Sequence, residues 1–556
     1  NRARSRYPEF VRSALEDWGK HGEKLDTLMQ QLANISPEDV VGINGHLRRA
    51  TKRTLGGQLR ELYLACVLSG PPANVSNVLG MTYALTVQMP LESAFASAFD
   101  AARYRVEQGL HKVGLKEEAA APRSRYFGEL GAMLKSLGVT TAARELRPED
   151  GPLVAFQRGL RQGLAAGLQA WKTETSRFEA AQATEAQAPG QIPGRAGRVI
   201  RTPLRGLMAM DEVFKVVFKN TELHAQAFAA AKSSGARGSQ AISDHMANTL
   251  DGWKRNPHTY AVDKATREAL YWTLNIQPGE LGRSLLRFRQ HHPNLIWLVP
   301  VLRTPINSVN FALERTPAKL IPFGKALAAY AKGELSPRDL SAEAAKTAFG
   351  LLLFAGIAEL VSSGRITGAG PKDEGKRKTL EATGWQPYSL RLGGDFHQLI
   401  RFDPLATAVF MVADFVEAMQ GGMEAQEVPG HLLHALTRQL QDKPFISGLS
   451  GIFKAIMDDE RYGPTFARRT LGAVVPNLVA YGARAADPRR RTPESFLDTL
   501  RSRIPGLNEK MLNLEQVPEY LDIYGRPVER PGLLGSPALG AAERFLSPSV
   551  RMPEIT

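Results

Sequence analysis

Cysteine is nearly absent from this sequence of 556 residues, which contains only Cys66. A single cysteine excludes an intrachain disulfide, and its apolar neighbours in LYLACVL predict a small core side chain. Acidic residues are also scarce relative to basic ones, since 56 Asp and Glu accompany 70 Lys and Arg and give a formal net charge of +14. Such an excess favours a polyanionic partner, either nucleic acid or an anionic membrane surface, with a basic protein lacking such a partner as the alternative.

The sequence also lacks a complete nucleotide-binding motif. GPKDEGKR at 370–377 nearly matches the phosphate-binding G-x-x-x-x-G-K-[ST] loop. Arg377, however, replaces the hydroxyl that would hold Mg²⁺, and Asp373 and Glu374 place negative charge where phosphates would bind. An apolar helix rather than a strand precedes the segment, so we reject it as a nucleotide site.

Two further patterns are too incomplete to define a site. LES at 91–93, which contains Glu92, and GLM at 206–208 match fragments of lytic transglycosylase motifs, but they lie far apart and lack the remaining residues. His431 and His434 are one helical turn apart, yet no HExxH motif or cysteine cluster completes a metal site. We therefore expect no enzyme activity, no catalytic residue, no cofactor and no metal.

Uncharged segments are long but interrupted. Thirty residues at 62–91 carry no charge, and Gly70, Pro71 and Pro72 divide them because proline cannot donate a helical hydrogen bond. The second limb, 73–91, is long enough to cross a bilayer core of roughly 30 Å, but its Asn, Ser, Thr and Gln residues make it a poor transmembrane helix. We predict an apolar helical hairpin at 62–91 that is buried inside a protein assembly.

The segment 201–232 has the pattern of an amphipathic helix, with apolar residues on one face and charged residues, including Lys215 and Glu222, on another. Asp211 and Glu212 stand beside the apolar face. Acid–base chemistry is one interpretation of this pair. Acids close to a helix start more often interact with the helix dipole, and this is the interpretation we favour.

The stretch 347–414 combines two apolar helices with the only sheet signal in the sequence. The first apolar helix is followed by a glycine-rich exit at 364–370 and then by a charged connector, PKDEGKRK. YSLRL and FHQLIRF flank Gly393 and Gly394, whose freedom to adopt positive φ predicts a β-hairpin at about 385–403. The second apolar helix follows this hairpin.

These patterns predict a mainly α protein, an elongated multi-helix assembly with one small β-hairpin and an extended C-terminal tail. The predicted regions are an N-terminal helical region at 1–180, a flexible connector at 181–200, a central helical region at 201–380, the hairpin with its apolar helices at 381–486, and a basic, extended segment at 487–556. No internal repeat period is evident.

Four segments carry a family resemblance: LACVLSGPPANVSNVLG at 64–80, GLMAMDEVFKVVFKNTELHAQAF at 206–228, LRTPINSVNFALERTP at 302–317, and parts of 364–409. Within the last, GWQPY at 384–388 is the most specific. Together and in this order, they resemble the large polyvalent proteins of tailed bacteriophages, including the internal virion or ejection proteins of short-tailed phages. With RSRIPGLNEK and DIYGRPV further on, the resemblance covers most of the chain.

This resemblance implies a structural role. Ejection proteins lie inside the capsid near the portal, leave before or with the genome, and assemble a conduit across the host envelope. The expected partners are therefore further copies in a ring or tube, other internal virion proteins, the portal or tail, and the host inner membrane. The expected location is the virion interior and then the host cell envelope, in the periplasm or inner membrane.

Double-stranded DNA is a further expected partner, bound through its phosphates without sequence readout. The candidate DNA-facing residues are basic side chains in two segments, Arg365, Lys372, Lys376, Arg377 and Lys378, and then Arg489, Arg490 and Arg491. Solvated loop charges are the alternative interpretation of these residues. Two other functions stay open: a static internal core or portal-associated scaffold that organises packaged DNA, and a cell-wall-degrading enzyme whose scattered site includes Glu92.

Overall fold

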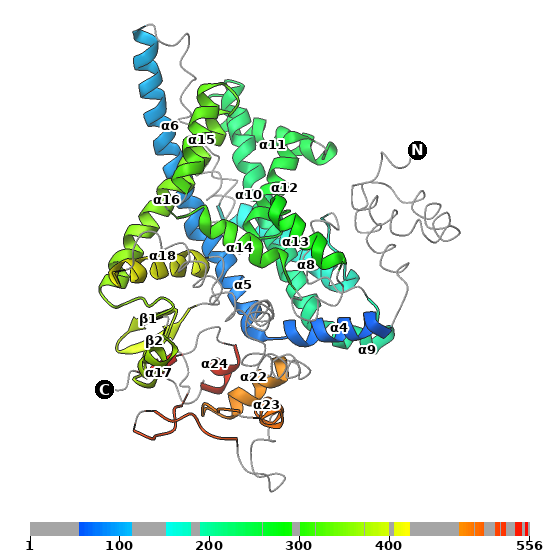
Figure 1. The fold of residues 1–556 in the computed structure, drawn as a ribbon. Helices are drawn as coiled ribbons and strands as arrows, with labels where there is room; N and C mark the ends of the chain where they lie inside the picture. Colours follow the sequence, from blue (N-terminus) through cyan, green and yellow to red (C-terminus); the bar gives the residue numbers. More distant parts are fainter. Residues whose placement is uncertain are drawn as a thin grey trace.

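The computed structural model describes residues 55–113, 152–178, 190–257, 259–291, 301–316, 319–371, 373–399, 405–422, 477–493, 495–504, 517–522, 524–529, 540–546 and 551–553. These residues form packed helices with one small sheet, so the predicted mainly α class is confirmed. Figure 1 shows the helical body, with the sheet at one side of it.

The first described elements are the helices α4 (Leu55–Leu68), α5 (Pro71–Tyr83) and α6 (Met89–Lys112), with a π-helical turn, η2 (Ala84–Gln88), between α5 and α6. The helix break falls at Gly70, before the two prolines. The predicted hairpin at 62–91 is wrong, because α5 turns away from α4 and continues through η2 into α6 (Figure 1). The π turn before Pro90 loosens the hydrogen-bond ladder where proline cannot donate, so the helix continues.

Helix α10 (Thr202–Ser233) lies at the centre of the body, and α8 (Pro152–Thr173), α11 (Ser239–Arg255) and α12 (Tyr260–Trp272) pack against it. Gly167 lets α8 approach closely, since a Cβ atom there would lie 2.8 Å from the carbonyl oxygen of Ala209. Phe218 of α10 stacks on Trp272 of α12 with ring centroids 6.0 Å apart. Helix α10 therefore has packed neighbours on more than one face, and not only on its apolar side.

The second half of the predicted flexible connector at 181–200 forms a short helix, α9 (Gly194–Ile200), so that part of the prediction is wrong. Residues 181–189 lie outside the described residues. Just before α9, the backbone N–H of Gln191 donates to the Glu61 carboxylate of α4 over 2.5 Å. This bond attaches the end of the connector to the helical body.

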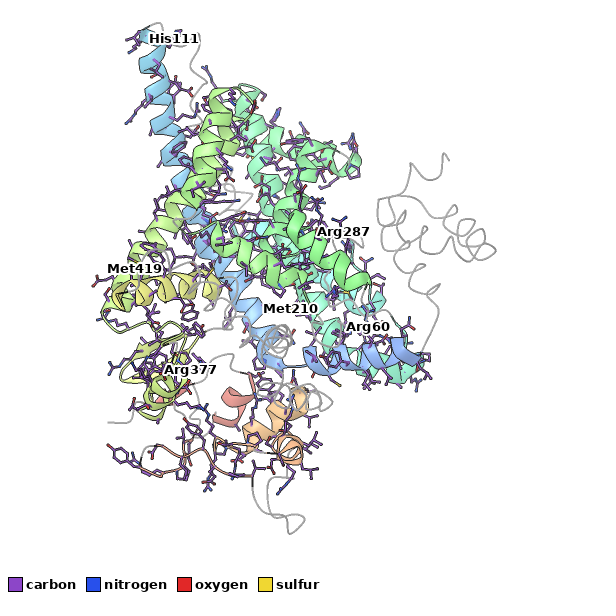
Figure 2. The ribbon with its side chains drawn as sticks, in the orientation of Figure 1. Arg60, His111, Met210, Arg287, Arg377 and Met419 are labelled. Carbon is purple, nitrogen blue, oxygen red and sulfur yellow. The ribbon has the colours of Figure 1, made fainter. Side chains whose placement is uncertain are left out.

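The next described helices are α13 (Glu280–His291), α14 (Arg303–Leu313) and α15 (Leu320–Ala331), and the longer helix α16 (Pro337–Ser362) follows them. The Ser336 hydroxyl caps α16 by accepting a hydrogen bond from the Asp339 N–H. Helix α16 packs along α6, which continues past the body to a tip at His111 (Figure 2). Among the described residues, Asp339–Ser362 is the one helical stretch with the length and apolar character of a membrane span, and 39% of its apolar window is buried.

Gly350 marks a close approach between α16 and the chain that follows α14. A Cβ atom there would lie 2.6 Å from the backbone carbonyl carbon of Arg315. Gly350→Ala is therefore expected to lower the free energy of unfolding by about 1–3 kcal/mol. Gly356→Ala, on the same helix with open space around it, should instead stabilise by up to about 1 kcal/mol. Urea unfolding followed by circular dichroism checks this, and equal midpoints for the two variants would contradict it.

The sheet is antiparallel, in the order β1 (Ser389–Leu392), β2 (Asp395–Gln398) and β3 (Arg551–Pro553). Strands β1 and β2 turn at Gly393 and Gly394, whose φ angles are 60° and 92°, so the predicted hairpin is confirmed. Strand β3 comes from the end of the chain and pairs with β2. This third strand was not predicted, because nothing local links it to the hairpin.

The predicted charged connector, PKDEGKRK, is helical from Glu374 onward. It forms the start of α17 (Glu374–Ala382), because the Asp373 carboxylate caps the helix by accepting a hydrogen bond from the Lys376 N–H at 2.9 Å. After the hairpin, the second apolar segment forms α18 (Leu405–Gln420), as predicted, and packs against α16.

The C-terminal segment contains extended chain and short helices. Residues 487–493 lie against residues 517–522 and 524–529 through isolated antiparallel bridges, including one between Arg491 and Glu519. These parts agree with the predicted extended tail. Helix α22 (Asn477–Ala486) precedes this arrangement. Helices α23 (Phe496–Arg501) and α24 (Gly540–Leu546) lie inside the segment 487–556, so the prediction of an extended chain is wrong for these two parts.

Candidate functional site

Arg315, just after α14, is the centre of a buried polar network that joins three helices. Its side chain is 1% exposed, and its Nε donates to Glu92 of α6 over 2.8 Å. Its Nη1 donates to the Tyr271 hydroxyl of α12 over 2.9 Å and to the backbone oxygen of Phe311 over 3.0 Å. The guanidinium carbon also lies 3.5 Å from the centroid of the Phe311 ring. One side chain therefore fixes the relative positions of α6, α12 and α14.

The network extends from Tyr271 to α16. The Tyr271 hydroxyl donates to Glu314, and Lys346 of α16 lies 3.4 Å from the same carboxylate. Burial acts to raise the pKa of Glu314, but Lys346 and the Tyr271 hydroxyl outweigh it and hold that pKa below its ordinary value. Burial acts to lower the pKa of Lys346, but Tyr271 and Glu314 outweigh this effect and raise that pKa above its ordinary value. A further pair, Lys319 with Glu343 at 2.6 Å, also ties α16 to the chain before α15.

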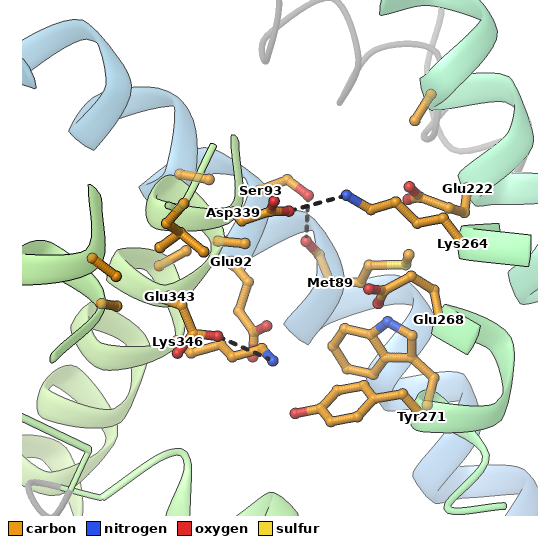
Figure 3. A pocket seen from close by; sticks show the side chains of 18 of the residues that line it. Met89, Glu92, Ser93, Glu222, Lys264, Glu268, Tyr271, Asp339, Glu343 and Lys346 are labelled. Atoms are coloured by element: carbon orange, nitrogen blue, oxygen red, sulfur yellow. Dashed lines mark hydrogen bonds and ion pairs between the residues drawn. The ribbon is translucent and has the colours of Figure 1, made fainter. Parts of the chain in front are cut away.

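Side chains from these pairs border a pocket of about 570 Å³ between α6, α10, α12, α15 and α16 (Figure 3). Lys264 of α12 reaches Asp339 of α16 over 3.3 Å at one side of it. Both oxygens of Glu92 accept hydrogen bonds, from Arg315 and from the Gln88 amide. Glu92 therefore serves as an acceptor that holds α6 against the chain after α14. In the described part of the chain no group of three or more His, Cys, Asp or Glu could hold a metal ion.

A second buried network surrounds Lys215 of α10, whose side chain is fully buried. Its ammonium lies 2.7 Å from Asp211 and 3.7 Å from Glu212. Glu212 also accepts hydrogen bonds from the Ser176 hydroxyl and the Arg177 N–H, after the end of α8. Burial raises the pKa of Glu212, which Lys215 and these donors partly oppose.

The helix-dipole interpretation of Asp211 and Glu212 is therefore wrong. Both residues lie in the third turn of α10, away from its N-terminus, and both carboxylates are buried. Asp211 accepts a hydrogen bond from the Asn275 amide at 2.8 Å, in the chain after α12. The pair links α10 to its neighbours.

A third network holds α4, α8 and α10 together. Arg201, just before α10, contacts Glu61 of α4 at 2.5 Å and Glu174, after α8, at 3.0 Å. Glu61 is fully buried, and its second oxygen accepts the Gln191 N–H described above. An isolated carboxylate at this depth would be costly, so the two donors explain how it is accommodated.

The glycine-rich exit after α16 is held by carboxylates of α18. Glu417 accepts hydrogen bonds from the Gly368 N–H at 2.5 Å and the Gly370 N–H at 3.1 Å, and Asp414 accepts one from the Ala369 N–H at 2.6 Å. Burial raises the pKa of Glu417, against the effect of these donors. These three backbone N–H groups, of which only that of Gly370 belongs to the rejected motif at 370–377, are thus occupied by the protein's own acids.

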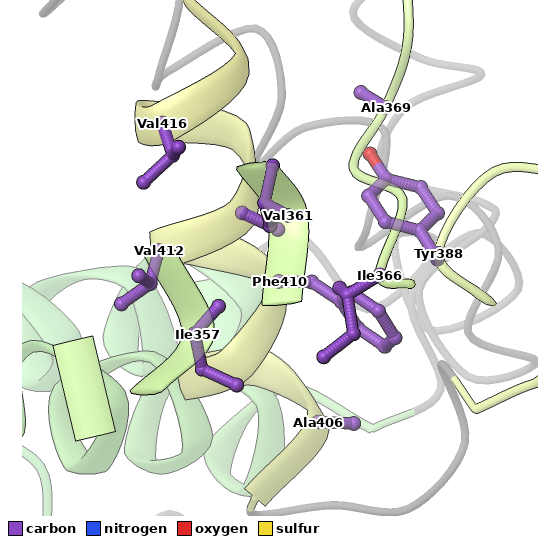
Figure 4. Close-up of a cluster of buried hydrophobic side chains, with 10 residues drawn as sticks. Ile357, Val361, Ile366, Ala369, Tyr388, Ala406, Phe410, Val412 and Val416 are labelled. Carbon is purple, nitrogen blue, oxygen red and sulfur yellow. The ribbon is translucent and has the colours of Figure 1, made fainter. Parts of the chain in front are cut away.

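Behind this loop lies a hydrophobic cluster between α16, α18 and the start of the hairpin (Figure 4). Ile357 and Val361 of α16 face Phe410 and Val412 of α18. Tyr388 packs edge-on against Phe410 with ring centroids 5.4 Å apart. Since Tyr388 belongs to GWQPY, the most specific family-like segment has a direct packing role.

The first group of predicted DNA-facing residues lies beside the hairpin. Arg365, Lys376 and Lys378 are exposed. Arg377 lies 3.6 Å from Glu381 on the same helix, and Lys372 is outside the described residues, as are His431 and His434.

The second group lies in the C-terminal bridges, away from the first in sequence and fold. Arg489 and Arg491 pair with Glu519 at 2.6 Å and 3.3 Å. The Arg490 guanidinium lies 4.3 Å from the centroid of the Tyr520 ring. Part of the positive charge here is therefore used within the protein, and the structure does not bring the two groups into one described site.

The buried networks were not predicted, although the sequence contains a signal for one of them. Asp211, Lys215, Phe218 and Glu222 recur at a spacing of four, three and four residues, which places them on one face of α10. Charged residues on the same stripe as a buried phenylalanine indicate an internal ion pair. No comparable local signal identifies Arg315, because its partners come from distant helices.

No family model matches the chain, and no curated protein or solved structure is significantly similar to it. Its function is therefore inferred from its own residues.

Proposed function

We propose that the chain is a structural protein of a tailed-bacteriophage virion, an internal or ejection protein that assembles in several copies near the portal and helps deliver the genome across the host envelope. The observation that carries this proposal is where the family-like segments fall in the fold. Segment 206–228 contributes Lys215 and its acids, 302–317 contributes Arg315, and 364–409 contributes the loop held by Asp414 and Glu417. The segments that resemble the phage proteins thus contain several of the residues that determine the helix arrangement.

The chemistry of the networks supports a structural role. A buried ion pair adds little net stability compared with an apolar contact, but separating its partners is costly because a charge is left uncompensated. Such pairs select one arrangement of helices. In the described pocket the carboxylate of Glu92 has protein donors on both oxygens, so a substrate-directed role has no support there.

Exposed apolar side chains support assembly with neighbouring copies. Helix α15 has no buried residue, and Leu320, Ile321 and Leu327 are 48%, 73% and 49% exposed. Leu351 and Leu352 of α16 are also exposed. Apolar side chains gathered on neighbouring helices favour contact with another apolar surface. The net charge of +14 favours a location beside DNA, with Arg365, Lys376 and Lys378 as exposed candidates for phosphate contacts.

Quantitative mass spectrometry of purified virions, before and after DNA release, tests this proposal. The expected result is several copies per full particle and few or none in the emptied particle. Retention at full copy number would contradict ejection and favour the static scaffold. Absence from full particles would contradict a virion protein altogether.

A further inference from the structure

Arginine is the only basic residue type in the described helices α4, α9, α13, α14, α22, α23 and α24, apart from the terminal histidine of α13, and the first three of these helices supply most of the arginines. Helices α4, α9 and α13 together contain six arginines and no lysine: Arg60, Arg195, Arg198, Arg283, Arg287 and Arg289. Their acids are Glu61 and Glu280, and Glu61 is buried against Arg201. Guanidinium groups are suited to phosphate because their planar donors form paired hydrogen bonds with its oxygens, which an ammonium group cannot do.

A hydrogen bond and close packing join α4 to the chain directly before α9, and α13 is close enough for its charge to act on α4. The Glu61 carboxylate of α4 accepts the Gln191 N–H directly before α9, and Gly57 of α4 lies against the Gln191 side chain. Arg60 of α4 lies within electrostatic reach of Arg289 on α13, since burial and this neighbouring charge lower the pKa of Arg60. Figure 2 shows Arg60 and Arg287 on the same side of the helical body, with Arg287 above Arg60 in this view. The arginines of α4 and α13 therefore lie on one side of the body, and α9 is joined to α4 next to them.

Exposed apolar side chains lie among these arginines. On α4, Leu55, Leu59 and Leu62 recur at helical spacing and are 79%, 57% and 42% exposed, with Arg60 beside them. Val199 of α9 is 72% exposed and Leu285 of α13 is 43% exposed. Apolar side chains flanked by cations on the surface of a helix are typical of binding in the interface plane of a membrane.

We infer that α4, α9 and α13 form a surface that lies on an anionic lipid bilayer, with its arginines on lipid phosphates and its leucines in the acyl boundary. This deepens the proposed function and rests on it for its setting, since the host inner membrane is one of the partners expected there. Duplex DNA also offers phosphates, but it has no apolar layer to cover Leu55, Leu59 and Val199. The exposed leucines therefore favour lipid over nucleic acid.

Helix α16 has the length of a membrane span, but unlike the surface formed by α4, α9 and α13 it could meet lipid only by leaving the helical body. Removing α16 from the body would break the Lys346 and Glu343 pairs and the packing of Ile357 and Val361. Helices α4, α9 and α13 can meet a bilayer with the described body intact. The inference is thus that the folded chain binds on the membrane and does not span it.

Vesicle flotation with the full chain tests this inference. The wild-type chain should bind vesicles that contain phosphatidylglycerol and should not bind vesicles of pure phosphatidylcholine. Arg60→Gln/Arg283→Gln/Arg287→Gln should weaken binding roughly 100-fold, because each cation near an anionic surface contributes about a five-fold factor. Leu55→Ser/Leu59→Ser should weaken vesicle binding at least about tenfold and leave binding to duplex DNA unchanged.

The matched control is Arg365→Gln/Lys376→Gln/Lys378→Gln, which removes the same charge from exposed positions beside the hairpin. It should change vesicle binding less than about threefold if the contact is local. Circular dichroism spectra establish that each variant is folded. Binding that falls equally in the control, persists in the leucine variant, or is absent from the wild-type chain would overturn the inference. Loss of DNA binding in the arginine variant, with vesicle binding kept, would reassign the surface to DNA.

The experiments can contradict the proposed phage role and the inferred membrane-binding surface independently of each other. Vesicle binding by a chain that mass spectrometry does not find in virions would leave the membrane surface standing and remove the phage role. An ejected chain whose vesicle binding is unaffected by these variants would keep the phage role and remove this surface.

Discussion

Replacing Arg315 with methionine is expected to lower the free energy of unfolding by about 3–5 kcal/mol. The guanidinium is fully buried and donates to Glu92, Tyr271 and the Phe311 carbonyl. Methionine fills similar space but leaves the Gln88 amide as the remaining described donor to the Glu92 carboxylate. Urea unfolding monitored by circular dichroism measures the loss.

Two further variants distinguish a broken ion pair from a disturbed core. Arg365→Met, at an exposed position, should change the free energy of unfolding by less than about 0.5 kcal/mol. Glu92→Leu combined with Arg315→Met should recover most of the lost stability, because an apolar pair of similar volume leaves no buried charge. If the double variant were as unstable as Arg315→Met alone, the charge left on Glu92 would not be the cause.

Lys215→Met is expected to produce a loss of similar size, about 3–5 kcal/mol, because it leaves the neighbouring carboxylates of Asp211 and Glu212 buried without their cation. The loss should depend on pH. Burial already raises the pKa of Glu212, and removing Lys215 raises it further. A carboxyl whose folded-state pKa is raised costs stability as the pH rises through the interval from its unfolded to its folded value.

The deficit of Lys215→Met should therefore be largest at neutral pH and shrink as the pH falls toward about 4.5, because the Glu212 carboxyl takes up a proton over this interval. Lys219→Met on the same helix is the matched control. Burial lowers the pKa of Lys219, so its charge is already disfavoured and its removal should cost less than about 1 kcal/mol. A deficit for Lys215→Met that is independent of pH would show that the lost charge is not responsible.

Local chemistry made several elements predictable. The hairpin turns at Gly393 and Gly394, α16 begins after the Ser336 cap, and the first helix break falls at Gly70 before two prolines. In each case the decisive residues lie within a few positions of one another, and backbone freedom, a cap or a missing N–H determines the outcome.

Features that depend on distant partners were not predictable in this way. In the sequence, Asp211 and Glu212 have the pattern of helix-dipole partners. Their hydrogen bonds to Asn275 and Ser176, which come from other parts of the chain, appear only in the folded structure. The π turn before Pro90, through which α5 continues into α6, was not predicted. Strand β3 joins the hairpin from the end of the chain, and Arg315 collects partners from α6 and α12. Buried ion pairs are hard to predict because a charged side chain alone favours solvent, and only the assembled partners make burial tolerable.

The most direct measurement of the central claim is an image of the chain inside the particle, by localised cryo-electron microscopy reconstruction of full virions. The account predicts several copies of this helical body arranged around the DNA next to the portal. Density for the chain as an isolated globule elsewhere in the particle, touching neither other copies nor DNA, would contradict it.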